Sequence, residues 1–564
     1  MGRLLIFLIV LFIQNSIFSQ VAYPQDYFEK PLEIPLILSG TFGELRSNHF
    51  HSGLDIKTQG REGLNVCAAA GGYVSRIKIS HWGYGKALYI THPNGYTTVY
   101  GHLKKFSPKI EAYIKKRQYE NESFEIQLFP KASELTVSKQ EIVAFSGNSG
   151  GSGGPHLHFE IRNAKEYPMN PMLFGIQVPD SKSPQIRAAV VYSFGDSSHV
   201  NQSNSVKELN FKPQKDGSFI ADKIEAYGTI GFGVNSVDRL DGALNNNGIF
   251  DLKMIVNGTT TYEHSLDEFS FSETRYLNTL IDYGRFYNKS QRIQKTFVEP
   301  ANKLSIYKTL KNKGYLTVKD SASYMVQIIA RDFSGNQTKL IIPVKGKKDS
   351  VYIREEIKTS SHFFKHGEFN RINAGKVTVA FPKNSFYNDL YFNFKQENEV
   401  AFLHDGSVPL HKNFTLTFDV SNHTKDEQGK LFIGRVNDKG TPYYTSTRRK
   451  DNKIYTLSRT LGNYAVFSDN QKPKVTPINF KNEQWLTKYR YLKVKISDDL
   501  SGIKSYRAEI DGSWILMEYD PKTNLLTYDF NDSELTGAQH TLKVEVVDNV
   551  NNSNTYIATF FKKH

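Results

Sequence analysis

Two short motifs contain the side chains of this sequence that are best suited to chemistry. The first is His51-Ser-Gly-Leu-Asp55, and the second is His156-Leu-His158. Residues two apart on a strand point to the same face of a sheet, so His156 and His158 would face one site. Imidazole and carboxylate groups are natural zinc ligands, and a catalytic zinc takes three protein ligands plus water. One of the four side chains would then be free to act as a base.

Each motif has a simpler explanation when taken alone, because a His-x-His pair or a His-x-x-x-Asp spacing also arises by chance. Their joint presence is stronger evidence, since seven of the 16 histidines lie between positions 49 and 158. The stretch Gly147-Asn-Ser149-Gly-Gly151 also spells the nucleophile elbow of serine hydrolases. That elbow must be followed by a helix, and the glycines and the proline that come next exclude one. We therefore favour a metal site over a serine nucleophile.

The two motifs together resemble the LytM-type (lysostaphin-like) zinc metallopeptidases of peptidase family M23. The resemblance extends over residues 36–175 and includes the segment Tyr100-Gly-His102-Leu103. It also includes the glycine-rich approach from Ser146 to His158. The layout of the whole chain is similar to the large Bacteroidetes-type members of this family, which implies a Gram-negative cell envelope.

The resemblance implies a role for each of five side chains. His51, Asp55 and His158 would bind one Zn²⁺ ion per chain. His156 would be the general base that takes a proton from the water at zinc. His102 would be a second catalytic histidine, which orients that water or stabilises the oxyanion. These roles agree with the chemistry, because zinc makes water acidic near pH 7 and a neutral histidine can accept that proton.

The elements that must position these residues are mostly strands. Short runs rich in Val, Ile, Tyr and Phe alternate with Gly, Asn and Asp turns, so we expect a mainly β chain. Residues 72–79, 87–91 and 96–100 predict three strands of a small antiparallel β-sheet in the metallopeptidase domain. Pro93-Asn94-Gly95 predicts a tight turn between the last two strands.

The clearest predicted helix lies in an insertion at 104–136. It begins after Ser107, a natural N-cap, with Pro108 at the first helical position, and it ends near Gln118. Its apolar stripe consists of Ile110, Tyr113 and Ile114. The insertion could form a wall or lid over the cleft, or it could serve only for packing.

The later part of the chain contains a weak internal repeat. One copy pairs Asp238 at a strand end with a closing strand that runs into Asp332 and Asn336, and the other pairs Asp498 with Asp548. Evenly spaced short strands of this kind suggest β-sandwich (Ig-like) domains. The Asp and Asn clusters could bind Ca²⁺, but they lack a complete loop of oxygen ligands. Turn capping is therefore the favoured interpretation.

Length and N-terminal composition predict an exported protein of several domains. The 564 residues exceed a single core, and an apolar run from Leu4 to Ile13 is typical of a secretory signal peptide. Ten apolar residues are too few to span a bilayer, so we expect no transmembrane span in the mature protein. The expected location is the periplasm or cell envelope of a Gram-negative bacterium. The expected division is a signal peptide at 1–19, an M23-type zinc peptidase domain at 36–175, a β-sandwich-like domain at 180–346, a β-rich domain at 355–468 and a C-terminal Ig-like β-sandwich domain at 470–564.

Net charge and cysteine content limit the partners. The formal net charge is +14, but the basic residues are scattered along the chain. A nucleic-acid footprint would be clustered, so we expect no nucleic-acid partner. An anionic cell wall or membrane surface would suit the charge. Cys67 is the single cysteine, which excludes an intramolecular disulfide.

The leading hypothesis is an exported zinc metalloendopeptidase that hydrolyses the peptide cross-links of bacterial peptidoglycan. One alternative is a non-catalytic envelope protein that binds and activates other wall hydrolases. Such a protein should have lost a ligand, and none is lost here. Another alternative is a protease that acts on an envelope protein. The C-terminal β-domains could bind the wall or envelope protein partners, although a role as spacers is the default because sandwiches host unrelated functions.

Overall fold

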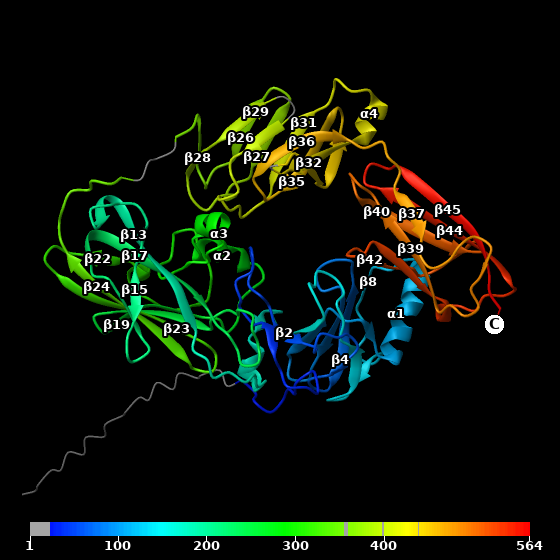
Figure 1. The fold of residues 1–564 in the computed structure, drawn as a ribbon, viewed down its shortest axis with the longest axis horizontal. Coiled ribbons are helices and arrows are strands. Elements are labelled where there is room, and N and C mark those ends of the chain that lie inside the picture. The colour runs from blue at the N-terminus through cyan, green and yellow to red at the C-terminus, as the bar shows by residue number, and fades with distance from the viewer. Residues whose placement is uncertain (1–22, 355–358, 398–399, 438, 564) are drawn as a thin grey trace, which may run out of the picture.

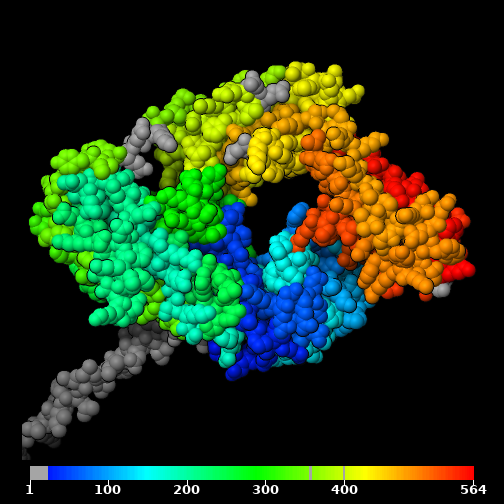
Figure 2. Space-filling model, viewed as in Figure 1, coloured from blue at the N-terminus to red at the C-terminus, as the bar shows by residue number. Residues whose placement is uncertain are grey.

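The structure is a computed structural model that describes residues 23–354, 359–397, 400–437 and 439–563. The predicted signal peptide at 1–19 lies outside these residues. Strands dominate the described chain, so the prediction of a mainly β fold is confirmed. The β-rich units follow one another around a ring, and the last unit returns to the first (Figure 1). Figure 2 shows the opening that this ring leaves at its middle.

An antiparallel sheet of nine strands forms the frame of the N-terminal unit. Its main path runs through β1 (Leu38–Gly40), β2 (Leu54–Lys57), β11 (His156–Arg162), β6 (Thr97–Gly101), β5 (Lys86–Thr91), β4 (Gly72–Ile79) and β8 (Ile126–Leu128). Two short strands extend it, namely β9 (Thr136–Val137) on β4 and β12 (Pro168–Met169) on β11. A second, smaller sheet contains β3 (Asn65–Cys67), β10 (Ile142–Phe145) and β7 (Lys105–Phe106).

The three strands predicted from the sequence are present as β4, β5 and β6. Their observed ends agree with the predicted ends to within one residue. The predicted turn between β5 and β6 is also present. Gly95 adopts a φ of 84° there, which a residue with a Cβ rarely does, and its N–H donates to the carbonyl oxygen of His92.

The predicted helix is present as α1 (Pro108–Asn121) and runs past its expected end at Gln118. Ser107 precedes it, but the Ser107 side chain makes no capping hydrogen bond. Instead, the Glu111 carboxylate accepts the N–H of Phe106 at 2.9 Å. The buried face of the helix consists of Ile110, Ile114 and Gln118.

The apolar core of the N-terminal unit continues into the unit that follows. Leu54, Tyr100 and Phe159 are fully buried in the sheet, and the same cluster includes Phe269 and Leu277 from the next unit. Buried apolar area is the main favourable term in folding, so a shared core holds the two units together. The two units therefore share one continuous core.

The second unit is built on a 12-stranded sheet. Its longest strands are β13 (Gln185–Val200), β17 (Ile224–Val237), β24 (Gln337–Gly346), β23 (Ser323–Arg331), β18 (Asp251–Val256) and β19 (Thr259–Ser265). Two short helices lie between β19 and β23, namely α2 (Leu277–Leu280) and α3 (Tyr283–Lys289). In the parts of the chain that the structure describes, no helix combines the length and the apolar character that a membrane span requires.

The third and fourth units each contain two main sheets. In the third unit, one sheet contains β26 (Asn370–Ala374), β27 (Val377–Phe381), β31 (Phe414–Asp419), β35 (Lys453–Ser458) and β34 (Thr447–Lys450). The other sheet contains β29 (Phe394–Glu397), β30 (Val400–Leu403), β36 (Gly462–Ser468), β32 (Leu431–Val436) and β33 (Pro442–Tyr444). In the fourth unit, one sheet contains β37 (Lys474–Pro477), β39 (Tyr491–Ser497), β43 (Leu525–Asp529) and β42 (Glu518–Asp520). The other sheet contains β38 (Gln484–Trp485), β45 (Ser553–Phe561), β44 (Gln539–Asp548), β40 (Ile503–Ile510) and β41 (Ser513–Trp514).

The fourth unit closes the ring by docking on the N-terminal unit (Figure 1). The rings of Tyr119 on α1 and Trp514 on β41 meet edge to face, with their centroids 5.3 Å apart. Three ion pairs join the same units: Lys86 with Glu518, Lys115 with Asp532 and Glu122 with Arg507. The insertion at 104–136 therefore packs on the core with one face and receives the C-terminal unit with the other.

Candidate active site

Three neighbouring strands position the candidate site. β11 lies between β2 and β6, and its His158 is directly opposite Asp55 on β2 and Gly101 on β6. Cross-strand neighbours have Cβ atoms roughly 5 Å apart, so this register alone brings Asp55 and His158 together. His156 precedes His158 by two positions on β11 and lies on the same face. His102 follows directly after β6.

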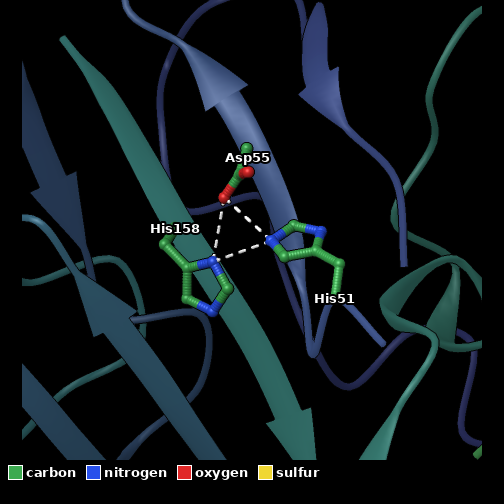
Figure 3. Close-up of side chains that lie close together, drawn as sticks. All are labelled: His51, Asp55 and His158. Atoms are coloured by element: carbon green, nitrogen blue, oxygen red, sulfur yellow. Dashed lines mark hydrogen bonds and ion pairs between the residues drawn. The ribbon is translucent and has the colours of Figure 1, made fainter. Parts of the chain in front are cut away.

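The three predicted zinc ligands meet at one point (Figure 3). Asp55 Oδ1 lies 2.9 Å from His158 Nδ1 and 3.0 Å from His51 Nε2. The two ring nitrogens lie 3.1 Å apart. His51 and His158 are only 7% and 2% exposed. A carboxylate oxygen and two imidazole nitrogens therefore converge in a mostly buried position.

Hydrogen bonds on the far side of each ring determine which nitrogens are free. His51 Nδ1 lies 2.8 Å from the carbonyl oxygen of Thr41, which can only accept, so Nδ1 carries the hydrogen. His158 Nε2 lies 2.7 Å from the carboxylate of Glu160 and is likewise the donor. In the neutral rings, the two nitrogens that face Asp55 then carry lone pairs only. Three electron-rich atoms this close need a cation among them, and this donor set fits zinc.

Glu160 has no assigned role in the sequence analysis, but it lies at the centre of the network behind His158. Its Oε1 also accepts hydrogen bonds from Ser52 at 2.7 Å and Tyr84 at 2.5 Å, and its Oε2 accepts one from Arg162 at 2.6 Å. Burial alone would raise the pKa of Glu160, but Arg162 and His158 hold it below its ordinary value. Its position two residues beyond His158, on the same strand face, is the signal that could have identified it.

Arg46 holds the second oxygen of Asp55, and no motif in the sequence pointed to this residue. Its Nη2 lies 2.9 Å from Asp55 Oδ2. Burial alone would raise the pKa of Asp55, but the charge of His51 and the close contacts with the surrounding histidines hold it well below its ordinary value. Asp55 is therefore anionic, with one oxygen on Arg46 and the other directed at the histidines.

The two predicted catalytic histidines lie beside this group. The ring centroids of His156 and His102 are 4.7 Å apart. His156 Nδ1 lies 2.9 Å from the carbonyl oxygen of Gly154, and His102 Nδ1 lies 2.8 Å from that of Ser149, so each ring carries its hydrogen on Nδ1. Burial, and then the charges of its histidine neighbours, lower the pKa of His102 to about 3. The structure thus brings all five predicted side chains into one site. His156 Nε2 is directed at the predicted metal ligands, 3.4 Å from Asp55 Oδ1.

An open cavity of about 630 Å³ leads to this site. Arg46, Asp55 and His156 line it, together with the end of the glycine-rich approach at 153–155 and Gly242 from the second unit. Small-ligand sites commonly have volumes of about 300–1,000 Å³, so a peptide segment would fit. The second unit therefore forms part of the wall beside the site.

The site combines two histidines and a carboxylate as possible metal ligands with two further histidines beside them. This is the donor set of a metal-dependent hydrolase. The family models agree with this class, because residues 49–119 match peptidase family M23. Residues 361–469 match the Zu5-like domain. The segment 49–119 is therefore similar to the peptidases of family M23.

Curated proteins similar to this chain match it over a limited part. The DD-carboxypeptidase/endopeptidase Mpg of Neisseria meningitidis serogroup B is 27% identical over 168 residues, which are 30% of this chain and 30% of that protein. An uncharacterized metalloprotease of Haemophilus influenzae is 33% identical over 111 residues, which are 20% of this chain and 18% of that protein. The chain thus spans less than a third of the length of these relatives.

Solved structures similar to this chain include two peptidase domains. The catalytic domain of the prophage-encoded M23 protein EnpA from Enterococcus faecalis is 23% identical, covering 27% of this chain and 98% of that chain, with a TM-score of 0.20. The catalytic domain of the antimicrobial peptidase lysostaphin from Staphylococcus simulans is 20% identical, covering 25% of this chain and 91% of that chain, with a TM-score of 0.19.

Proposed function

We propose that this protein is a zinc metalloendopeptidase that cleaves peptide cross-links of bacterial peptidoglycan. The observation that carries the proposal is the convergence of Asp55 Oδ1, His51 Nε2 and His158 Nδ1 within 3.1 Å of one another. Both nitrogens are freed for a metal because the opposite nitrogen of each ring donates to Thr41 or Glu160. The match of residues 49–119 to peptidase family M23 supports the reaction class.

The chain's own residues divide the work as follows. His51, Asp55 and His158 would hold Zn²⁺, which, when bound, polarises the scissile carbonyl and makes water acidic near neutral pH. His156 would accept the proton of the attacking water at Nε2, because its Nδ1 is already committed to Gly154. His102 would orient that water or the developing oxyanion through its own free Nε2.

Location and partners follow from the substrate. A peptidoglycan hydrolase must reach the wall, so we place the protein in the periplasm or cell envelope, exported by the signal peptide predicted at 1–19. The relative named DD-carboxypeptidase/endopeptidase supports a substrate of this kind. We further propose the division into a peptidase domain at 36–175 and β-rich domains at 180–346, 355–468 and 470–564. The last three would bind envelope partners or act as spacers.

Digestion of purified peptidoglycan, with the products identified by mass spectrometry, tests this function. The wild-type protein should release muropeptides with cut cross-links, and the masses will name the bond. His156→Ala should lower the rate by about 100-fold or more, because a general base contributes at least that much. His49→Ala is the matched control, since His49 is an exposed neighbour whose side chain contacts the adjacent Asn48.

Two other outcomes would select other functions. If neither wild type nor His156→Ala cuts peptidoglycan, but zinc-loaded wild type cuts an envelope protein, the substrate is a protein. If no hydrolysis occurs with any substrate, and the protein instead stimulates other wall hydrolases, the non-catalytic alternative holds. The retention of all five side chains argues against the latter.

A further inference from the structure

Three aspartates far apart in the sequence meet at the joint between the N-terminal and second units. Asp180 lies in the connection between the units, Asp238 directly follows β17, and Asp332 directly follows β23. One oxygen from each lies within 4.8 Å of the others. A Ca²⁺ ion binds oxygen at 2.3–2.6 Å, so the oxygens around it can be separated by up to about 5 Å. The spacing therefore allows all three to bind one ion.

The carboxylates of this cluster have no cationic partner in direct contact among the described residues. Asp238 is only 1% exposed, and its Oδ1 has no hydrogen-bond partner among the described residues. The Asp180 Oδ2 atom is also buried without a partner there. No Lys, Arg or His of the described chain forms an ion pair with any of the three carboxylates. The nearby Lys182 pairs with Asp241 instead. Burial, and then the charge of Asp180, raise the pKa of Asp238 to about 7.

A small cavity lies against these carboxylates. Its volume is about 20 Å³, which is enough for a single ion or water molecule. Asp180, Asp238 and Asp332 line it from the connection and the second unit, and Thr41 and Asn170 line it from the N-terminal unit. An ion in this cavity would therefore contact both units at their joint.

We propose that Asp180, Asp238 and Asp332 bind one hard divalent cation, Ca²⁺ in preference to Mg²⁺, at the joint between the peptidase domain and the second unit. All-oxygen donors select hard cations, and a cluster drawn from three separate segments suits the irregular coordination of Ca²⁺ better than the strict octahedron of Mg²⁺. This site is distinct from the proposed zinc site. It is nevertheless connected to it, because Thr41 accepts the hydrogen bond that orients His51.

The same arrangement occurs a second time, where the third unit meets the fourth. Asp469, Asp498 and Asp548 also lie within 4.8 Å of one another. Asn552 donates its side-chain N–H to Asp548 and to the backbone oxygen of Asp469. Asn336 does the same for Asp332 and Asp180.

The second cluster differs in that none of its carboxylate oxygens is among the buried atoms without a partner in the described chain. Both Asp469 oxygens accept backbone N–H groups, at 3.0 and 3.1 Å, and Asp498 Oδ1 accepts two more. Turn capping, which the sequence analysis favoured for these residues, thus describes the second cluster well. It does not describe Asp238, whose Oδ1 is buried without a donor. We therefore confine the proposal to the first cluster.

Calcium titration of the full-length, zinc-loaded protein tests the proposal. After dialysis against calcium-free buffer, isothermal titration with CaCl₂ should show one site per chain, with weaker or no binding of MgCl₂. Asp238→Asn should lose this binding by at least tenfold, while zinc content stays at the wild-type level. Asp241→Asn is the matched control, because Asp241 is three positions away and only half-buried, with Lys182 as its partner.

Thermal unfolding separates a cation site from turn capping. In wild type, CaCl₂ at about 100 times its dissociation constant should raise the relevant transition by about 5–10 °C. Without calcium, Asp238→Asn should melt at the wild-type temperature or above, because one of three mutually repelling charges is removed. Absence of calcium binding at millimolar concentration, or equal binding by Asp238→Asn, would overturn the proposal. A calcium-independent loss of stability in Asp238→Asn would instead assign Asp238 to capping.

Discussion

His51 Nε2 and His158 Nδ1 lie 3.1 Å apart. Each ring donates a hydrogen bond through its other nitrogen, His51 to Thr41 and His158 to Glu160. The two rings come from segments more than 100 positions apart, so this approach is a property of the sheet. Unshared electron pairs repel unless a proton or a metal ion lies between them. Burial of His158 alone would lower its pKa, but the adjacent carboxylates of Asp55 and Glu160 raise the pKa to about 9. The pocket is thus arranged to hold positive charge.

Metal analysis should separate the ligands from the base. Wild-type protein should contain about one zinc per chain, as expected for a site with three protein ligands. Asp55→Ala and His158→Ala should lose both zinc and hydrolysis. His156→Ala should retain zinc and lose hydrolysis. Mass spectrometry of the metal content, beside a peptidoglycan assay, checks both properties. Zinc-free wild-type protein after zinc-replete growth would contradict the assignment.

Glu160→Gln should weaken zinc binding without removing a ligand. The change leaves the size of the side chain but removes the charge that holds His158 by its Nε2–H. Loss of such a supporting contact costs about 10–100-fold in metal affinity. Competition with a chromogenic chelator measures this change. Glu166→Gln is the control, because Glu166 bonds to the same Arg162 at 3.2 Å but is mostly exposed. Equal affinities in the two variants would show that Glu160 does not support the site.

Gly53→Ala should disturb the pairing of β2 with β11. A Cβ at Gly53 would lie 2.3 Å from the backbone oxygen of Phe159, a distance that forces one strand to move. Overpacking of this kind costs about 1–3 kcal/mol, and here it displaces the strands that carry Asp55 and His158. We expect lower stability and loss of zinc. Gly153→Ala should change neither, since no atom lies within 4 Å of its added Cβ. Circular dichroism and metal content report both effects.

Lys115→Met should open the ring. The Asp532 side chain is 5% exposed, and Lys115 on α1 is the cation that pairs with it. Removing one partner of a buried ion pair lowers stability by about 3–5 kcal/mol. The cost is smaller here because the Lys115 side chain is 31% exposed. We expect a larger radius of gyration in small-angle X-ray scattering and faster proteolysis between residues 469 and 474. The neighbouring Lys116→Met is the control, because Lys116 is exposed. An unchanged scattering profile would mean that the other contacts suffice.

Ring closure also bears on the active site. Lys522 of the fourth unit donates to the backbone oxygen of Asn148, and Lys86 pairs with Glu518 at 2.8 Å. Ser149, which follows Asn148 in the chain, accepts at its backbone oxygen the hydrogen bond that orients His102. The same Lys115→Met variant should therefore lower the hydrolysis rate more than zinc content, whereas Lys116→Met should lower neither. Peptidoglycan hydrolysis measured at equal zinc loading checks this expectation.

Local information in the sequence determined the elements and the identity of the candidate site. Alternation placed β4, β5 and β6 to within a residue, because side-chain direction along a strand depends on neighbouring positions only. The N-terminal Pro108 and the apolar stripe identified α1 for the same reason. Chemical type and spacing selected His51, Asp55, His156 and His158, and the resemblance to family M23 added His102 and the role of each side chain. The sequence also showed that Asp238 and Asp498 occupy equivalent positions in a repeat.

Tertiary structure alone decided how these residues are held. The roles of Glu160 and Arg46 depend on which side chains lie behind the site, and local periodicity carries no information about that. The meeting of Asp180 with Asp238 and Asp332, and of α1 with the fourth unit, joins segments tens to hundreds of residues apart. Such contacts form because folding buries apolar surface over the whole chain, and the positions of buried charges then follow from packing.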